Sequence, residues 1–324
     1  MYTTVLYEFA VLQRELNINA PFKSYPKYYD SSTKSSNEAL ILEDMKEKGF
    51  ELYKGRKLLN FEHAVMILRE YAKLHALSFA MRLHKPNLFK KLVEHAGESF
   101  FPIFERTNKD NGYWKQGEKI LLTIDQVKEK SLYEKFEKFV TNMSDLIQNL
   151  LKSNFTSPHG VINHGDCWLK NYLFKYNTYY TPIQVCILDW QLSNYGSPVI
   201  DLAYFIYSCT EKELRDKYYE ILIEDYYNTF STILTEMGGK PEQQFSFKTL
   251  QDHLKKYSVF GLYAALITLL LINNDNSEVF DAEDILDAGE LVERVKKNTD
   301  DECLYNQRMK DVILDIERLG YDFY

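Results

Sequence analysis

The residues that could do chemistry gather in one short block of the chain. Asp166 is preceded two positions earlier by His164 and followed five positions later by Asn171. Two short apolar stretches around a polar, tyrosine-rich turn come next, and the second of them ends at Asp189. An Asp, an Asn five residues on and an Asp at the end of a hairpin form the layout of a kinase-type phosphoryl-transfer site.

Phosphoryl transfer needs in-line positioning and charge neutralisation more than covalent help from the protein. Asp166 would accept, or at least orient, the proton of the attacking hydroxyl. Asn171 would offer an amide oxygen and Asp189 a carboxylate to Mg²⁺, which prefers a few hard oxygen ligands completed by phosphate and water. His164 would brace the loop by hydrogen bonding rather than act as an acid or base. The alternative is ordinary: an Asp and an Asn at this spacing also arise by chance, and Asp189 could simply cap a strand end.

Two flanking segments agree with the phosphoryl-transfer interpretation. Asp201 starts a helix, where its carboxylate could accept hydrogen bonds from the backbone of the catalytic loop or simply cap the helix. The segment Ile41–Met45 is an apolar strand that ends in acidic residues. The backbone groups of Glu43, Asp44 and Met45 suit a hinge that meets an adenine edge, and the alternative for their side chains is a solvated strand end.

The hydrophobic periodicity indicates which elements must hold these residues. It predicts a helix over Val5–Leu16 and then a strand on each side of the polar stretch Asp30–Glu38, the second strand being buried. A β-rich block over about 158–200 interrupts an otherwise helical chain, and loops on a rigid scaffold often carry chemistry. The helices predicted after residue 57 cover 61–82, 132–152, 201–209, 212–237, 247–272, 282–298 and 301–319.

Composition excludes several classes of protein. The 324 residues carry 39 basic and 47 acidic side chains, a formal charge of −8 that argues against a general nucleic-acid binder. The four cysteines are too scattered for a zinc site or a disulfide scaffold, which favours a reducing compartment. The N-terminus lacks a signal-peptide pattern, and the apolar run Val259–Ile272 is shorter than the about 20 residues of a membrane-spanning helix. We therefore expect a cytoplasmic monomer with neither a membrane nor a nucleic-acid partner.

Longer strings make the pattern specific. HGDCWLKN, ILDWQ and GSPVIDLAYF, with ILEDM and YAKLHALSFA upstream, resemble the ecdysteroid kinase-like family. That family contains the CHK kinase-like domain and is similar to the choline kinase and aminoglycoside phosphotransferase superfamily. The resemblance covers roughly residues 5–320. It implies an α+β, protein-kinase-like fold of two lobes, with a partial N-terminal lobe and hinge over 1–46, a mostly helical C-terminal lobe over 47–324 and a signature region over about 40–237.

The same resemblance implies ATP- and Mg²⁺-dependent phosphorylation of a hydroxyl on a small lipophilic molecule, such as an ecdysteroid or a hydroxylated xenobiotic. It matches Asp166 to the catalytic base, Asn171 and Asp189 to the metal ligands, and His75 to a helix histidine with a hydrogen-bonding role in the core. The apolar positions of the helices over 201–209 and 247–272 favour a lipophilic acceptor pocket. The candidate lining residues are Tyr204, Tyr207, Tyr257 and Tyr263.

One departure from the family concerns nucleotide binding. The small lobe of the family begins with strands that bear a phosphate-covering loop and a phosphate-binding Lys, and this chain starts at about the helix after them. Glu8 lies where the Glu partner of that Lys would be. No G-x-G-x-x-G occurs, and Gly112–Lys119 has Glu118 where a P-loop requires Lys. Two alternatives therefore stay open: a kinase-like binding protein with weak or no activity, and a choline- or aminoglycoside-type kinase.

Overall fold

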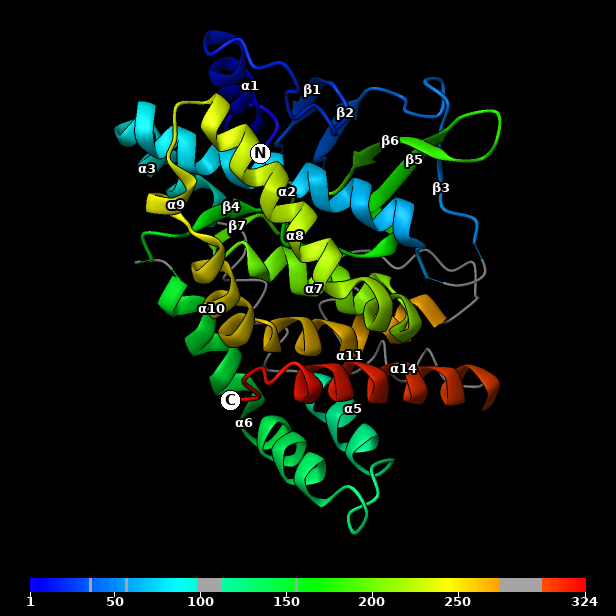
Figure 1. The fold of residues 1–324 in the computed structure, drawn as a ribbon. Helices are drawn as coiled ribbons and strands as arrows, with labels where there is room; N and C mark the ends of the chain where they lie inside the picture. Colours follow the sequence, from blue (N-terminus) through cyan, green and yellow to red (C-terminus); the bar gives the residue numbers. More distant parts are fainter. Residues whose placement is uncertain (35–36, 56–57, 98–111, 155–156, 274–298) are drawn as a thin grey trace.

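Helices make up most of the fold, and the strands are short (Figure 1). This computed structural model describes residues 1–34, 37–55, 58–97, 112–154, 157–273 and 299–324, so the helix predicted over 282–298 lies outside the described residues. The α+β class with a mostly helical body is confirmed. The helices are α1 (Val5–Glu15), α2 (Phe61–His84), α3 (Pro86–Gly97), α5 (Gly112–Leu121), α6 (Lys130–Asn154), α7 (Val199–Cys209), α8 (Lys212–Glu236), α9 (Pro241–Gln244), α10 (Phe247–Tyr257), α11 (Val259–Asn273) and α14 (Thr299–Arg318).

The strands of the described residues form three small antiparallel sheets. The first pairs β1 (Tyr28–Ser32) with β2 (Ala39–Leu42), and the second pairs β4 (Val161–Asn163) with β7 (Asn194–Gly196). The third has the order β3 (Phe50–Leu52), β5 (Tyr172–Tyr176), β6 (Pro182–Ile187). Within it, Tyr172 is the partner of Ile187. The chain just before β5 and the chain just after β6 therefore lie side by side.

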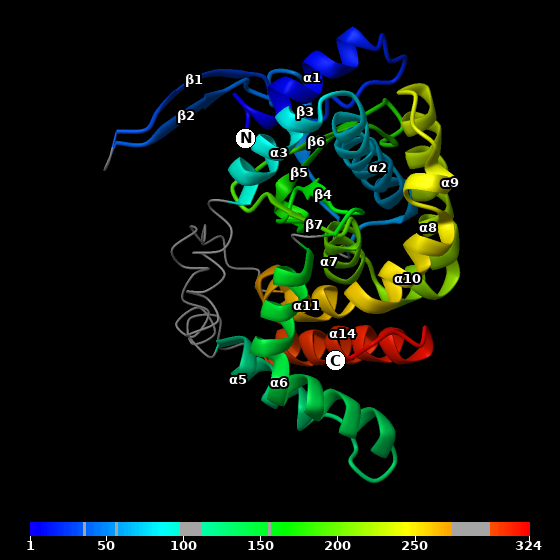
Figure 2. The ribbon, with the colours of Figure 1, turned by 90° about the vertical axis from the view of Figure 1, so that its left-hand side faces the viewer.

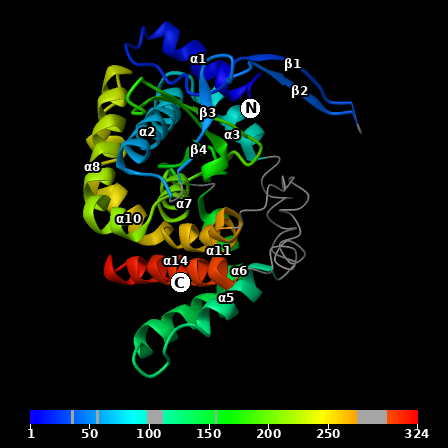
Figure 3. The ribbon, with the colours of Figure 1, turned by 90° about the vertical axis from the view of Figure 1, so that its right-hand side faces the viewer.

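The strand predicted at residues 39–42 exists, but the prediction that it is buried is wrong. Leu40 and Ile41 are 53% and 54% exposed. Figures 2 and 3 show the reason, because the β1–β2 hairpin projects from the body of the molecule. A two-stranded hairpin can bury a strand only where another layer covers it, so an apolar run alone does not reveal exposure.

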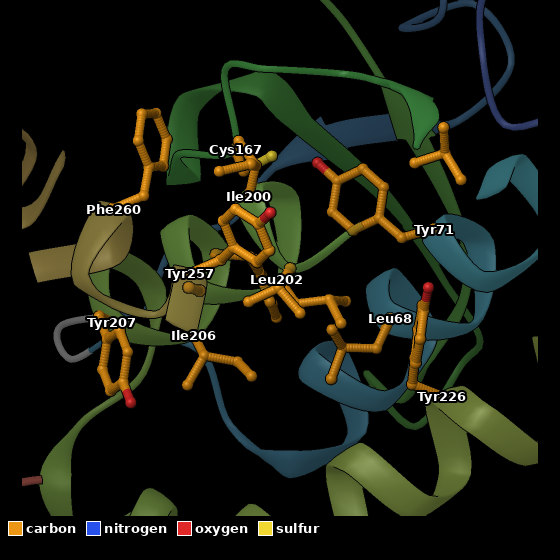
Figure 4. Close-up of a cluster of buried hydrophobic side chains, with 14 of the residues drawn as sticks. Leu68, Tyr71, Cys167, Ile200, Leu202, Ile206, Tyr207, Tyr226, Tyr257 and Phe260 are labelled. Carbon is orange, nitrogen blue, oxygen red and sulfur yellow. The ribbon is translucent and has the colours of Figure 1, made fainter. Parts of the chain in front are cut away.

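Helix α2 lies at the centre of the core. Its first half is amphipathic, but from Tyr71 to Met81 nearly every side chain is buried. A helix that is buried all round must have neighbours on several sides. Helix α8 packs along α2, and α7 lies between α2 and α11. Figure 4 shows Leu68 and Tyr71 of α2 in one cluster with Leu202 and Ile206 of α7.

The helix predicted over 247–272 is two helices. It breaks at Ser258, and α10 and α11 meet at a bend of 53°. Both helices pack against α7, and the bend lets each of them follow it. No single helix in the described part of the chain is long and apolar enough to cross a membrane, although α10 and α11 would be when taken together across their bend.

Gly261 sets how closely α11 approaches α7. A Cβ at this position would lie 2.5 Å from the carbonyl oxygen of Ala203. We expect Gly261→Ala to push the two helices apart and to lower the free energy of unfolding by about 1–3 kcal/mol. Urea denaturation followed by circular dichroism measures this change. In an open helix the same substitution would be stabilising, so an unchanged or higher midpoint would contradict the close contact.

Candidate functional site

The loop between β4 and β5 carries the predicted base, and it turns at Gly165. Gly165 has a φ of +87°, in the left-handed region that favours glycine. A Cβ there would lie 2.0 Å from the carbonyl oxygen of Leu192, so no larger residue fits. This turn places Asp166 between the end of the β5–β6 hairpin and helix α7.

Asp166 is 8% exposed, and each of its carboxylate oxygens has a donor. Asn171 Nδ2 donates to Oδ2 at 2.7 Å, and the Tyr204 hydroxyl donates to Oδ1 at 3.1 Å. Burial raises the pKa of Asp166 to about 6, and the negative charge of Asp189 adds to the rise. A carboxylate of this basicity suits proton acceptance near neutral pH better than an ordinary Asp does.

Asn171 ends the short 3₁₀ turn Leu169–Asn171. Its Nδ2 donates to the Asp166 carboxylate and also to the Asp166 backbone carbonyl, at 3.0 Å. Both partners are acceptors, so the amide NH₂ must face them. The amide oxygen Oδ1 is then the atom that Asn171 has left for a metal ion.

Asp189 follows β6 and is exposed. Its φ of +58° is unusual for a residue with a side chain, although Asp tolerates it better than most. Its Oδ2 accepts a hydrogen bond from Gln191 Nε2 at 3.2 Å. The backbone N–H of Leu188 donates to the carbonyl of Asn171 at 2.9 Å. The structure therefore brings Asp166, Asn171 and Asp189 to one place.

His164 joins the loop to the end of the hairpin. Its Nδ1 accepts from the Asp166 backbone N–H at 3.3 Å, and its Nε2 donates to the Leu188 carbonyl at 2.7 Å. The ring lies edge-on to Trp190, with centroids 4.8 Å apart. These contacts are the bracing arrangement expected from the sequence, and they leave neither ring nitrogen free for acid–base work.

Asp201 holds the backbone of the same loop. Its carboxylate accepts from the N–H groups of His164 and Gly165 at 2.7 and 2.9 Å, and His75 Nε2 lies 3.1 Å away. His75 also bonds the Tyr226 hydroxyl, so it has the core role expected of it. Simple capping does not describe Asp201, because it lies inside the first turn of α7. Burial alone would raise its pKa, but the hydrogen bond and charge of His75, with the other donors, hold the pKa below its usual value.

We expect Asp201→Asn to lower the free energy of unfolding by about 3 kcal/mol near pH 7, because an amide offers these donors one acceptor atom instead of two. A lowered folded-state pKa stabilises the fold above the unfolded pKa, and this stabilisation is lost as pH falls. The difference in free energy of unfolding between Asp201→Asn and the wild type should therefore become smaller at acidic pH. Urea denaturation at several pH values measures it. The matched control is Asp225→Asn, which removes the partner of Arg69 in a partly exposed ion pair, and an equal effect in both variants would contradict the role of Asp201.

The predicted hinge follows β2 as a turn. The N–H of Glu43 donates to the Lys27 carbonyl at 2.8 Å, and the carbonyl of Met45 accepts from the N–H groups of Lys48 and Phe50. Asp44 Oδ1 accepts from the N–H of Lys46 at 2.8 Å. These bonds occupy the N–H of Glu43 and the carbonyl of Met45, so an adenine edge would have to use the other backbone groups of this turn, such as the carbonyl of Glu43 and the N–H of Met45.

A cavity of about 610 Å³ lies between the β1–β2 hairpin and the chain after β6. Leu40 and Leu42 line one side, while Leu188, Asp189 and Trp190 line the other. The volume falls in the range of small-molecule sites. Asp189 is the predicted site residue on its wall, whereas Asp166, Asn171 and the hinge residues are not among its lining residues.

The four candidate tyrosines of the acceptor pocket have different surroundings. Tyr204 contacts Asp166, and Tyr263 stacks on Tyr113 with ring centroids 4.3 Å apart. Tyr207 and Tyr257 belong to the buried cluster drawn in Figure 4. The structure thus brings one of the four into contact with Asp166.

A further apolar cluster, which the sequence pattern did not indicate, lies beside this loop. Trp168, two residues after Asp166, packs against Ile267 and Leu271 of α11, with Tyr113 and Tyr204 at its edge. The sequence contains a signal for the contact of Tyr204 with Asp166. Tyr204 follows Asp201 by three residues, so the two side chains share one face of the helix. The packing of Trp168 had no such signal, because α11 is about 100 residues away in the chain.

Two further features bear on metal and nucleotide binding. Glu8 is half-buried on α1, and no ion pair of Glu8 is found within the described ranges. Within those ranges there is also no group of three or more His, Cys, Asp or Glu side chains that would hold a metal ion by itself. A Mg²⁺ ion here would need phosphate and water to complete its coordination, as Mg²⁺ usually does in proteins.

Comparison with known proteins adds the following findings. Residues 1–239 match the sequence profile of the ecdysteroid kinase-like family. Similar solved structures include an ethanolamine kinase of Plasmodium vivax (12% identity, 95% of this chain and 71% of that chain, TM-score 0.43). Another is a choline kinase of Cryptosporidium parvum Iowa II (17% identity, 96% of this chain and 79% of that chain, TM-score 0.38). A third is an aminoglycoside phosphotransferase of Alicyclobacillus acidocaldarius (11% identity, 96% of this chain and 82% of that chain, TM-score 0.38). No curated protein gave a significant match.

Proposed function

Because this chain belongs to the ecdysteroid kinase-like family, we propose that it transfers the γ-phosphoryl group of ATP to a hydroxyl of a small lipophilic molecule. The family, predicted from HGDCWLKN and its companion strings, is confirmed. The observation that carries the proposal is the placement of Asp166 beside both Asn171 and Asp189. We further propose that the protein acts as a monomer in the cytoplasm, without a nucleic-acid or membrane partner.

Asp166 would take the proton of the acceptor hydroxyl as the acceptor oxygen bonds to the γ-phosphorus and the bond from that phosphorus to the ADP oxygen breaks. Its place between two donors keeps the carboxylate oriented for this transfer. Asn171, through Oδ1, and Asp189 would hold the Mg²⁺ that neutralises charge on the phosphates. Their oxygen atoms fit a hard cation.

The cavity beside Asp189 supports a nucleotide site. Leu40 and Leu42 present an apolar surface on one side of it and Trp190 an aromatic one on the other. An apolar slot with a few polar groups is typical of sites for flat, polar-edged ligands. The exposed side chain of Leu40 would contact the nucleotide in this arrangement, because strand β2 forms one wall of the cavity.

The side of Asp166 that faces α11 supports a lipophilic acceptor. Trp168, Ile267 and Leu271 form an apolar cluster there, flanked by Tyr113. This support comes from particular side chains beside the loop of Asp166 rather than from the number of apolar positions in α7 and α11. A highly charged acceptor would lose its hydration against such a wall.

The test is an acceptor panel with Mg²⁺ and ATP, containing ecdysone, choline and an aminoglycoside. ADP release and the mass of the product are measured for each. We expect phosphorylated ecdysone and little turnover of the other two. Preferred phosphorylation of choline or the aminoglycoside would refute the lipophilic acceptor. Binding of ecdysone with no turnover would refute the transferase and favour a kinase-like binding protein.

A further inference from the structure

We infer that Tyr204 is a positioning residue for the base: its hydroxyl fixes the orientation of the Asp166 carboxylate and links it, through Thr268, to helix α11. This inference rests on the proposed function, because it gives Asp166 the role of base. It concerns contacts that the family assignment does not supply. Three observations on the described residues carry it.

The first observation is the division of donors on the carboxylate. Asn171 holds Oδ2 and Tyr204 holds Oδ1, at 2.7 and 3.1 Å, from different elements of the fold. The terminal torsion of an Asp side chain is broad when nothing restrains it. One donor would leave the carboxylate free to turn about that contact, whereas two donors on opposite oxygens fix its plane.

The second observation is the surroundings of the Tyr204 hydroxyl. Thr268 Oγ1 lies 3.3 Å from the Tyr204 oxygen and 2.8 Å from the carbonyl of Ala264. The Thr268 hydrogen is therefore shared between two acceptors, and its bond to Tyr204 is the weaker one. Because the Tyr204 oxygen accepts that bond, its own single hydrogen is directed to Asp166.

The third observation is that one helix positions both parts of the base. Asp201 holds the loop backbone, and Tyr204, one turn further along α7, holds the carboxylate. The ring of Tyr204 lies edge-on to Phe260 of α11, with centroids 6.4 Å apart. Since α11 also supplies Ile267 and Leu271 to the apolar wall, the acceptor side and the orientation of the base are joined through this helix.

The other titratable groups near the carboxylate do not replace this contact. His164 donates its hydrogen bond to the Leu188 carbonyl, and the charge of Asp189 repels the Asp166 carboxylate. Burial raises the pKa of Tyr113 and of Cys209, and the charge of Asp166 adds to the rise. Within the part of the chain that the structure describes, Tyr204 is the donor to Oδ1.

The test compares Tyr204→Phe with Tyr207→Phe, using ecdysone as acceptor. Both variants remove a hydroxyl from a tyrosine of α7. Tyr204 is partly buried beside Asp166, whereas Tyr207 is buried and its ring lies 5.8 Å from the Arg215 guanidinium. We expect Tyr204→Phe to lower kcat about tenfold with KM for ATP unchanged, because misplacing a catalytic group affects the chemical step. Tyr207→Phe should keep the wild-type kcat, with any effect confined to the unfolding midpoint.

Thr268 supplies a second arm. Thr268→Val should lower kcat by about two- to threefold, and Thr268→Ser, which keeps the hydroxyl, should restore it. Because Thr268 acts through Tyr204, the double variant Tyr204→Phe/Thr268→Val should be no slower than Tyr204→Phe alone. Additive losses would overturn the link to Thr268.

The outcomes separate this inference from the proposed function. A wild-type chain without turnover refutes the proposed function, and the positioning role with it. If the wild type turns over and Tyr204→Phe matches Tyr207→Phe, the inference alone is overturned. A loss in Tyr204→Phe that only follows its folded fraction, measured by circular dichroism, also overturns it.

Discussion

Asp166→Asn is expected to lower kcat by about 10³-fold while KM for ATP stays near its wild-type value. General-base catalysis contributes about 10²- to 10⁴-fold, and Asp166 is the carboxylate that both Asn171 and Tyr204 orient. An amide has the same shape but does not accept a proton near neutral pH. Steady-state kinetics with saturating ATP measure the loss.

The substitution separates chemistry from folding. The oxygen of the introduced amide can still accept from Asn171, and its NH₂ can donate to the Tyr204 oxygen. The amide therefore keeps a partner at each end, although its bond to Tyr204 is reversed and the Tyr204 hydrogen loses its acceptor. Asp252→Asn is the matched control, because Asp252 is an exposed partner of Lys248 on α10. A kcat within tenfold of the wild type in folded Asp166→Asn would exclude Asp166 as the base.

Local sequence was enough to predict the elements that hold this site. The apolar spacing of α1, α6 and the first half of α2 predicted these helices, because a helix with one buried face repeats every 3.6 residues. The contact of Asp166 with Asn171 was also accessible, since the two residues share one loop. The bracing by His164 followed from its place two residues before Asp166.

The remaining features depend on which helices and strands pack against one another. A local sequence pattern does not contain that information. Leu40 belongs to an apolar strand in either case, but its exposure depends on what covers the hairpin. The bend at Ser258 depends on how α10 and α11 both lie against α7. The contact of Thr268 with Tyr204 joins residues 64 positions apart, and only the crossing of two helices brings them together.

Asp189→Asn is expected to abolish measurable binding of Mg²⁺–ATP to this chain. Loss of a partner that only supports a metal ligand weakens binding by about 10- to 100-fold, and the loss of a charged ligand should exceed that. Asp189 lies on the wall of the cavity beside Leu40 and Leu42. Titration calorimetry with Mg²⁺–ATP measures the affinity directly and requires no acceptor.

The backbone of Asp189 decides which variant isolates its charge. Its φ of +58° is tolerated by Asp and Asn but strained for Ala. Asp189→Ala should therefore lose about 1 kcal/mol of folding free energy in addition to binding, whereas Asp189→Asn should lose binding alone. Wild-type affinity in Asp189→Asn would exclude this carboxylate as a metal ligand. Lost binding with an unchanged unfolding midpoint would assign the loss to the charge of Asp189, so Mg²⁺–ATP binding would be attributed to this site even before an acceptor is identified.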